Sequence, residues 1–293
     1  MKHIHFIINP IAGSGKNELN LDYLHSIFEK ENFNVVIKNS DYKTHAKTLT
    51  KASIEENADI IVACGGDGTI NEVANALVNT TIPLGIIPLG SGNGLASNLK
   101  IPIHTKEALL KIKKQSITQI DVGVLNGHYF FSNSGIGFDA NVVEEYEKAN
   151  KRKLSSYIRA SLKTFKNYKF NTTVELKIKD ESFIINPFMI FVSNSNELGY
   201  KVSLTPKASL HDGLLDVLII PKINKIKIIL LALLMLLKKT HLLNKVKHYQ
   251  VKSISILNKE KPLFTAQIDG EMHTIENKNI NISVLENGLN VIV

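Results

Sequence analysis

The sequence predicts an α/β protein of two domains, an N-terminal α/β half followed by a β-rich half with a helical insertion. Between residues 2 and 125, short β-branched runs such as "HIHFIIN" and "DIIVAC" alternate with helix-length segments such as "INEVANALVN". This alternation is typical of βαβ units in a mainly parallel sheet. At residues 122–131 the pattern changes, because "VGVLNGHYFF" places Asn126-Gly127 between two apolar runs. That dipeptide is characteristic of a tight antiparallel hairpin.

The other elements follow from the same patterns. Further strands of the first half are expected at "NVVIKN" and "PLGIIPLG", and helices at "LDYLHSIFEK", "HAKTLTKASIEE" and "TKEALLKIKK". After the hairpin, helices are expected near residues 140–149 and 154–168 and within 226–239, and strands at "TTVELKIKD", "FMIFVSN", "LLDVLII", "VKSISIL" and "NISVLEN". We therefore place the domains at residues 1–125 and 126–284, and residues 285–293 are compatible with a return to the first sheet.

Composition narrows the class of protein without naming a function. The chain is 44% hydrophobic and 21% charged with a formal net charge of +8, which suits an anionic partner of any kind. Cys64 is the single cysteine, so no internal disulfide is expected and a cytoplasmic location is the simplest expectation. The longest apolar run, residues 228–237, is about half of the roughly 20 residues that span a bilayer. No transmembrane helix is expected.

The stretch "GGDGTINEV" at residues 65–73 indicates a phosphate-binding turn. Thr69 and Glu72 have the spacing of a capping box and predict a helix start at Thr69, but an ordinary turn does not need Gly65, Gly66 and Gly68 together. Glycines let backbone N–H groups approach anionic oxygens at the positive end of a helix. Asp67 would then act through a magnesium ion on the phosphates.

Two more glycine-rich loops follow apolar strands, "NPIAGSGK" at residues 9–16 and "PLGSGNGLA" at residues 88–96. The first is not a Walker A loop, because Pro10 and Asn17 stand where glycine and Ser or Thr are required. The second is not a dinucleotide fingerprint, because Leu95 stands at its last glycine. Both loops are expected beside residues 65–69 at the carboxyl edge of the sheet, and Lys16 is either a phosphate ligand or a solvated loop residue.

The motifs "NPIAGSGK", "GGDGTINEV", "PLGSGNGLA", "HDGLLDV" and "IDGE", in this order, closely resemble the diacylglycerol kinase catalytic-domain family. That family includes bacterial soluble lipid kinases and sphingosine kinases. The resemblance implies an N-terminal nucleotide-binding domain like those of NAD kinases and phosphofructokinases and a C-terminal β-sandwich-like lipid domain. It also implies that ATP binds in the cleft between the domains.

The resemblance carries nucleotide-binding roles onto the N-terminal half. The residues implied are Asn9, Pro10, Ser40, Gly65, Gly66, Asp67, Gly68, Thr69, Ile70, Asn71 and Ser91. Ser40 and Ser91 stand where relatives usually carry threonine, and both keep the hydroxyl group.

In the C-terminal half the resemblance implies that Glu271 of "IDGE" is the general base. Asp212 would bind a structural magnesium ion together with the backbone carbonyls of Ser209 and Leu214, and Asp121 would belong to the same acidic network. Asp139 matches a position that binds lipid head atoms in sphingosine kinases, although it could equally cap the helix that begins there. Asp212-Gly213 and Asp269-Gly270 are also ordinary turn dipeptides.

The expected activity is that of an ATP-dependent lipid kinase, with Glu271 and Asp67 as catalytic residues and ATP and Mg2+ as cofactors. Diacylglycerol or a related glycerolipid is the favoured substrate, and a sphingoid base or ceramide is the alternative. A non-catalytic lipid or nucleotide sensor and a soluble-metabolite kinase are the competing classes. We expect transient association with the inner face of the membrane, through residues 226–239 unless these lie in the core. A homodimer is left open, and nucleic acid is not an expected partner because the chain lacks tryptophan and a basic-aromatic cluster.

Overall fold

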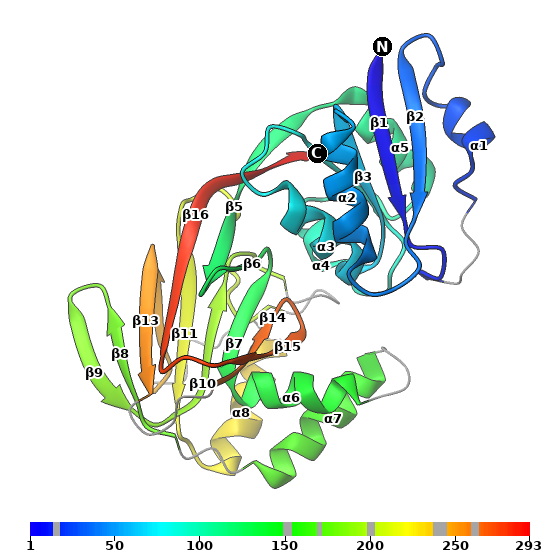
Figure 1. Ribbon diagram of the computed structural model, residues 1–293. Coiled ribbons are helices and arrows are strands. Elements are labelled where there is room, and N and C mark those ends of the chain that lie inside the picture. Colours follow the sequence, from blue (N-terminus) through cyan, green and yellow to red (C-terminus); the bar gives the residue numbers. More distant parts are fainter. Residues whose placement is uncertain (14–17, 149–153, 169–171, 198–202, 237–244, 259–263) are drawn as a thin grey trace. The chain divides into compact units, whose positions relative to one another are not determined.

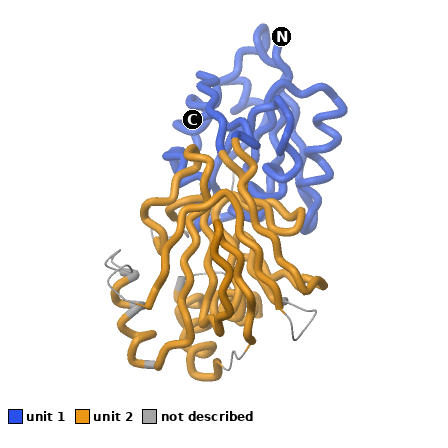
Figure 2. Tube along the Cα trace, turned by 90° about the vertical axis from the view of Figure 1, so that its left-hand side faces the viewer, with its two compact units in different colours: residues 1–120, 287–293 blue, residues 121–286 orange. Residues whose placement is uncertain are grey.

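The computed structural model describes residues 1–13, 18–148, 154–168, 172–197, 203–236, 245–258 and 264–293 (Figure 1). The chain forms two compact units, which Figure 2 distinguishes by colour. Unit 1 contains residues 1–120 and 287–293, and unit 2 contains residues 121–286. The predicted boundary at Asn126 lies inside unit 2, in the hairpin between β5 and β6. Lys16 lies outside the described residues.

Unit 1 is built on a parallel sheet in the order β2-β1-β3-β4. Its strands are β1 (Lys2–Ile8), β2 (Phe33–Asn39), β3 (Ile60–Gly65) and β4 (Leu84–Pro88). Its helices are α1 (Leu21–His25), α2 (His45–Glu55), α3 (Asp67–Leu77), α4 (Gly94–Asn98) and α5 (Thr105–Lys114). Every residue of β3 and β4 is buried, as expected for parallel strands covered on both faces. The parallel βαβ prediction is confirmed.

Unit 2 is made of two antiparallel sheets and three helices. One is the antiparallel part of the ten-stranded sheet that also includes β1 to β4. It contains β8 (Val174–Ile178), β9 (Glu181–Ile185), β13 (Ser253–Asn258), the first part of β16 (Asn279–Ile292), β6 (His128–Phe130) and β5 (Ile117–Leu125), whose residues up to Ile120 belong to unit 1. The other has the order β12 (Lys247–Val251), β11 (Leu215–Pro221), β10 (Pro187–Ser193), β7 (Asn133–Gly137), β14 (Phe264–Ile268), β15 (Glu271–Ile275). Side chains from both sheets, such as Leu176, Val217 and Ile256, share one hydrophobic core, so the unit is a β-sandwich.

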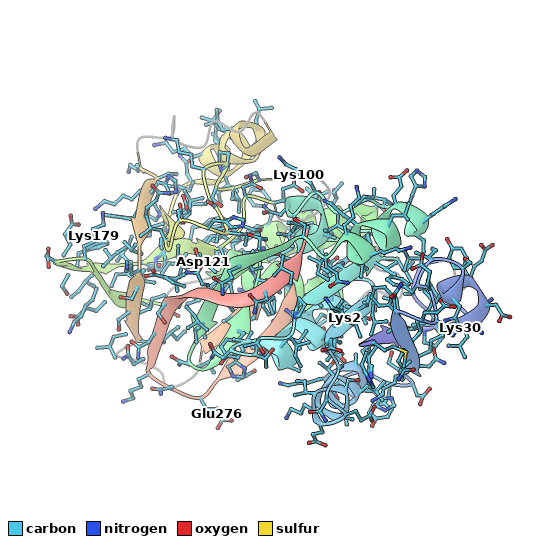
Figure 3. The ribbon with its side chains drawn as sticks, turned by 90° about the horizontal axis from the view of Figure 1, so that it is seen from above. Lys2, Lys30, Lys100, Asp121, Lys179 and Glu276 are labelled. Atoms are coloured by element: carbon cyan, nitrogen blue, oxygen red, sulfur yellow. The ribbon has the colours of Figure 1, made fainter. Side chains whose placement is uncertain are left out.

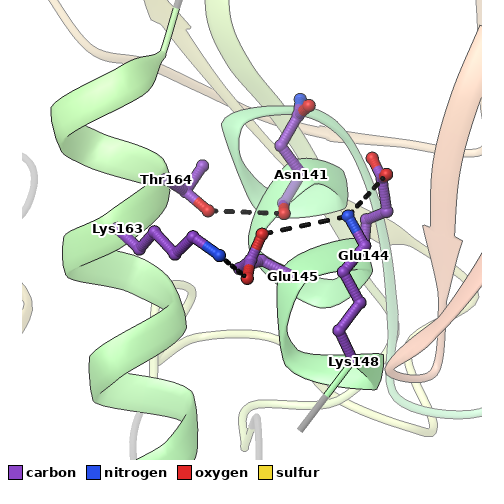
Figure 4. A network of polar contacts seen from close by, with 6 residues as sticks. All are labelled: Asn141, Glu144, Glu145, Lys148, Lys163 and Thr164. Carbon is purple, nitrogen blue, oxygen red and sulfur yellow. Dashed lines mark hydrogen bonds and ion pairs between the residues drawn. The ribbon is translucent and has the colours of Figure 1, made fainter.

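The three helices of unit 2 are α6 (Phe138–Glu147), α7 (Leu154–Asn167) and α8 (Lys225–Leu236). α7 is tied to α6 by polar contacts (Figure 4): Lys163 Nζ lies 2.5 Å from Glu145 Oε1, and the Thr164 hydroxyl donates to the Asn141 carbonyl at 3.4 Å. Lys148, the C-cap of α6, has its Nζ 3.2 Å from Glu144 Oε1. Both predicted helices near residues 140–149 and 154–168 are therefore present.

Two predicted turns are confirmed by backbone angles. Asn126 and Gly127 have φ of 44° and 85° between β5 and β6, and Asp269 and Gly270 have φ of 47° and 80° between β14 and β15. Positive φ at both central residues is the signature of the two-residue hairpin turn that such dipeptides favour. The second turn places Glu271 at the first residue of β15, opposite Ile268.

The predicted capping box is wrong. α3 already begins at Asp67, with Gly66 as its N-cap, so Thr69 lies inside the first turn. The Glu72 carboxylate instead accepts the backbone N–H groups of Thr44 and Ala46 at the start of α2. Glu72, which the local spacing assigned to a helix cap, therefore makes a tertiary contact with the start of α2 instead.

Two element boundaries also differ from the prediction. The stretch "VKSISIL" is not one strand, because β12 ends at Val251 and β13 begins at Ser253 in the other sheet. The helix expected at "LDYLHSIFEK" ends at His25.

The apolar segment 226–239 forms α8 as far as Leu236, and its last residues lie outside the described part of the chain. In the part of the chain that the structure describes, no helix is long and apolar enough to cross a membrane. Outward-pointing lysines such as Lys100 and Lys179 contrast with the buried Asp121 (Figure 3).

Candidate active site

The loop between β3 and α3 is packed backbone against backbone. A Cβ on Gly90 would lie 2.6 Å from the Gly66 Cα, and a Cβ on Gly65 would lie 2.5 Å from the Thr69 hydroxyl. Gly90 is therefore required by close packing between the turn and the neighbouring loop 88–96, and Gly65 by its contact with Thr69 in the first turn of α3. Gly68 is different, because a Cβ there would meet nothing within 4 Å. It faces open space at the first turn of α3.

Asp67 joins this turn to the loop that follows β4. Its Oδ1 accepts the Gly94 N–H at 2.7 Å and its Oδ2 accepts the Asn93 N–H at 2.8 Å. A Cβ on Gly92 would lie 2.6 Å from the same Oδ2, so Gly92 leaves room for the carboxylate. The loop is closed further by Asn93, whose side chain bonds both the N–H and the C=O of Gly90.

The first glycine-rich loop meets the same place. Asn9 donates its own backbone N–H to the Cys64 carbonyl at 2.9 Å and its side-chain Nδ2 to the Thr69 hydroxyl at 3.2 Å. A Cβ on Gly13 would lie 2.4 Å from the Leu89 carbonyl oxygen. The described parts of all three loops therefore lie side by side at the carboxyl edge of the sheet, as predicted from the strand pattern.

The other residues predicted to bind nucleotide differ in how accessible they are to solvent. Pro10 and Ser91 are solvent-accessible, whereas Ser40 is nearly buried and donates its N–H to the Ile8 carbonyl. Ile70 is buried, so only its backbone faces the turn. Asn71 accepts a hydrogen bond from Asn75 one helical turn later.

In unit 2, Asp121 and Asp212 lie beside the turn of "HDGLLDV". Asp121 is buried, its carboxylate accepts the Gly213 N–H at 2.7 Å, and its own N–H donates to the Leu210 carbonyl at 2.7 Å. The Asp212 carboxylate accepts the Leu214 N–H at 3.1 Å. Burial, and then the negative charges of Asp216 and Asp121, raise the pKa of Asp212. An excess of negative charge here favours a cation.

The predicted metal site stays a prediction, and its donor atoms are of the kind that suits magnesium. Magnesium prefers oxygen ligands, and Asp212 with the carbonyls of Ser209 and Leu214 would supply them. The described residues contain no group of three or more His, Cys, Asp or Glu side chains able to hold a metal, but one carboxylate with two carbonyls is a different kind of set. The remaining acid of the motif, Asp216, is fully buried and bonds His248 at 2.7 Å.

The hairpin that carries Glu271 is fixed by its aspartate. The Asp269 carboxylate accepts three consecutive backbone N–H groups, from Phe131 at 2.8 Å, Ser132 at 2.8 Å and Asn133 at 3.0 Å. Glu271 follows this turn and is half-buried. The prediction that Asp269-Gly270 forms a turn is thus correct. This turn also fixes the position of Glu271, the residue predicted to be the general base.

Asp139 is not a helix cap. The N-cap of α6 is Gly137, and no side chain caps it. Asp139 is 8% exposed, and its Oδ2 accepts a hydrogen bond from Gln267 Nε2 at 2.7 Å. Burial raises the pKa of this carboxyl to about 6. Sequence reasoning missed Gln267, whose only signal was a single amide among the apolar residues of "FTAQI".

Comparison with known proteins identifies the family. The diacylglycerol kinase catalytic domain matches residues 3–125, and the YegS C-terminal NAD kinase beta sandwich-like domain matches residues 133–293. The chain belongs to the diacylglycerol kinase catalytic-domain family. Its members are lipid kinases, so the protein is an enzyme of that class. The predicted family and the two-domain α/β fold class are both confirmed.

Individual relatives illustrate the match. A diacylglycerol kinase of Bacillus subtilis is 29% identical over 79% of this chain and 78% of that protein. A probable lipid kinase YegS-like protein of Pectobacterium atrosepticum is 34% identical over 58% of this chain and 59% of its own. An uncharacterized protein of Synechocystis sp. is 30% identical over 73% of this chain, but the match spans only 52% of that relative.

Solved structures agree on the fold. A crystal structure of a diacylglycerol kinase from Bacillus anthracis str. Sterne has a TM-score of 0.71 at 20% identity and covers 99% of this chain and 96% of its own. Another from the same organism has a TM-score of 0.78 at 24% identity, covering 99% and 95%.

Proposed function

We propose that the protein transfers the γ-phosphate of ATP to a hydroxyl group of a membrane lipid, and that the lipid is diacylglycerol or a related glycerolipid. Family membership gives the lipid kinase class. The observation that supports ATP use is the turn at residues 65–68, where Gly68 faces open space at the first turn of α3. Backbone N–H groups and the positive end of a helix suit phosphate oxygens there.

Asp67 has two tasks in this proposal. It orders the loop after β4 through its bonds to Asn93 and Gly94, and its carboxylate would help to hold a magnesium ion bound together with the nucleotide. Each carboxylate oxygen has acceptor capacity beyond one hydrogen bond, so the two tasks are compatible. A bound magnesium ion would neutralise charge on the phosphates.

Glu271 is proposed to accept the proton of the lipid hydroxyl. The hydroxyl oxygen bonds to the γ-phosphorus, the bond from that phosphorus to the bridging oxygen of ATP breaks, and ADP leaves. Positioning and charge neutralisation provide most of the rate enhancement in phosphoryl transfer. A carboxylate held on a clamped turn is suited to that role.

A lipid substrate requires contact with a membrane, and α8 supports such contact. Ile228 packs against a cluster of buried residues that includes Phe188 and Ile220, whereas Ile226, Ile229 and Leu233 are 78%, 62% and 54% exposed. An apolar helix face in water is typical of a surface that meets lipid. The alternative that α8 lies wholly in the core is not supported by these exposures.

Helix α7 adds to the same argument. Ile158 and Leu162 are exposed, as are the neighbouring Arg159 and Lys166. Apolar residues flanked by cations suit an anionic lipid surface. We therefore propose transient association of unit 2 with anionic membranes.

A sphingoid base or ceramide is the second substrate candidate, because "GSGNGLA" at residues 90–96 departs from the GTxNDFA-like form of many bacterial diacylglycerol kinases and is closer to that of sphingosine and ceramide kinases. The proposal is tested with radiolabelled ATP, magnesium and a panel of lipids in mixed micelles, with products separated by chromatography. Label in a phosphorylated glycerolipid is expected. Label in a sphingolipid selects the alternative, and label only in a water-soluble acceptor, or in none, overturns the proposal.

A further inference from the structure

The two peptide N–H groups on either side of Glu271 are both bound by side chains. The Gly270 N–H donates to Gln267 Oε1 at 2.9 Å, and the Met272 N–H donates to Glu147 Oε1 at 2.9 Å. Glu147 is the last residue of α6, and Gln267 lies in β14, two residues before the turn. The backbone that carries Glu271 is therefore held at both ends.

Gln267 links the turn to the first turn of α6. Its side chain is 1% exposed, and its Nε2 donates to Asn133 Oδ1 and to Asp139 Oδ2, each at 2.7 Å. With its Oε1 on Gly270, both donors and the acceptor oxygen are engaged. A buried amide that satisfies all its groups has one orientation.

The strand opposite Gln267, β7, carries a glycine that leaves room for the Asp139 carboxylate. Gly135 of β7 is the register partner of Gln267, and a Cβ on Gly135 would lie 2.2 Å from Asp139 Oδ2. No residue larger than glycine fits there while Asp139 reaches Gln267. The Asp139 carboxyl thus lies over β7 and acts as a fixed anchor.

We propose that Gln267 is a positioning residue for Glu271, and that Asp139 and Asn133 are the anchors through which it acts. This inference rests on the proposed function, in which Glu271 accepts the lipid proton. The hydrogen bonds of the Gln267 side chain go to Asn133, Asp139 and Gly270. Gln267 holds the backbone of Gly270, and the position of Gly270 sets the position of the Glu271 carboxylate that follows it. This position matters for the rate, because a displacement of a catalytic group by about 1 Å can reduce turnover by about 100-fold.

The test compares Gln267→Leu with Thr164→Val, which removes one nearly buried hydrogen bond of α7 in the same unit and lies outside the hairpin. Gln267→Leu should lower kcat by about 10- to 100-fold and leave the KM for ATP unchanged. Thr164→Val should leave kcat unchanged. A raised KM with normal kcat, or an equal effect of both variants, overturns the inference.

Should Gln267→Leu fail to fold, Gln267→Glu provides the same test. It keeps an acceptor for Gly270 but places a carboxyl against Asp139, so a hydrogen bond between them needs a shared proton. Its turnover relative to the wild type should rise as the pH falls. A ratio that does not change with pH contradicts the proposal.

A double mutant separates this inference from the proposed role of Glu271. If Gln267 acts through Glu271, Gln267→Leu should cost no further kcat in a Glu271→Gln background. If Gln267→Leu lowers kcat in the Glu271→Gln background by the same factor as in the wild type, the positioning role is overturned and the role of Glu271 is not. Full activity of Glu271→Gln by itself overturns the general base, and the positioning role with it.

Discussion

The carboxylate of Asp67 accepts the N–H of Gly94 at 2.7 Å and so connects the first turn of α3 to the first residue of α4. Asn93 donates to the other oxygen of the same carboxylate. Two glycine-rich loops that are separate in the sequence are thereby ordered by a single acid. Charged acceptors form stronger hydrogen bonds than neutral ones.

Asp67→Asn should therefore impair nucleotide use. An amide keeps one acceptor oxygen and turns a donor toward the other N–H, so one hydrogen bond is lost and no anion remains for magnesium. We expect kcat/KM for ATP to fall by about 10- to 100-fold, from roughly 1.5–3 kcal/mol for a charged hydrogen bond. Asp59→Asn is the matched control, because Asp59 accepts the His3 N–H elsewhere in unit 1. Equal kinetics for the two variants would contradict the role of Asp67.

Glu271→Gln should fold and bind ATP normally but lose turnover by about 100- to 10,000-fold, the usual contribution of a general base. Product formation, thermal unfolding and calorimetric ATP binding measure these effects separately. Glu276→Gln, a change at an exposed carboxylate a few residues away, should retain wild-type turnover.

Asp212→Asn should abolish stabilisation by magnesium. In the wild type, the thermal unfolding midpoint should rise with Mg2+ concentration, because a ligand that binds only the folded state stabilises it. Without metal, the pKa of Asp212 is raised in the folded state, so the folded state binds a proton more tightly than the unfolded state does. This stabilises the folded state at a pH below the ordinary carboxyl pKa, and the stabilisation is lost as the pH rises. A magnesium-dependent midpoint that persists in the variant would place the ion elsewhere.

Asp139→Asn should change how stability depends on pH. Burial raises the pKa of the Asp139 carboxyl in the folded state to about 6, from an ordinary value of 3.8. Its stabilising contribution is complete below pH 3.8 and is lost as the pH rises through about 6. Relative to wild type, the variant should gain on the order of 3 kcal/mol of unfolding free energy between pH 3 and pH 8. Denaturant unfolding at several pH values measures this, and parallel curves would contradict it.

Substitutions on α8 should separate membrane binding from folding. Ile229→Ser combined with Leu233→Ser removes two exposed apolar groups, so sedimentation with anionic vesicles should fall about tenfold or more while thermal stability is kept. Ile184→Ser is the control, because Ile184 on β9 is 67% exposed. Equal loss in both cases, or no binding by the wild type, would count against α8 as the membrane contact.

Local chemistry made part of this structure predictable. Asn126-Gly127 and Asp269-Gly270 have positive φ that favours these residue types, so both hairpins follow from the dipeptides alone. Parallel strands end at one edge, which is why the three glycine-rich loops could be placed together. Glu72 was assigned wrongly because its partners, Thr44 and Ala46, lie at the start of another helix, α2.

Other features depend on partners that are distant in the sequence. Gln267 reaches Asp139 and Asn133 across more than 120 positions of the chain, and nothing in its own strand marks it as different from a solvent-facing polar residue. The passage of the chain from one sheet to the other at Lys252 also cannot be recognised in the sequence, because the stretches before and after it have the same alternation of polar and apolar residues. Long-range pairing decides these positions.

The last strand has a consequence for biosynthesis. Residues 279–283 of β16 pair with β13, whereas Val291 pairs with Leu84 of β4, and Leu289 and Ile292 are buried with it. The sheet of unit 1 therefore gains its final member only after all of unit 2 has emerged from the ribosome. Unit 1 cannot be completed during translation of its own first 120 residues, and a nascent chain stalled before β16 should carry an open edge at β4 that chaperones or neighbouring chains can engage.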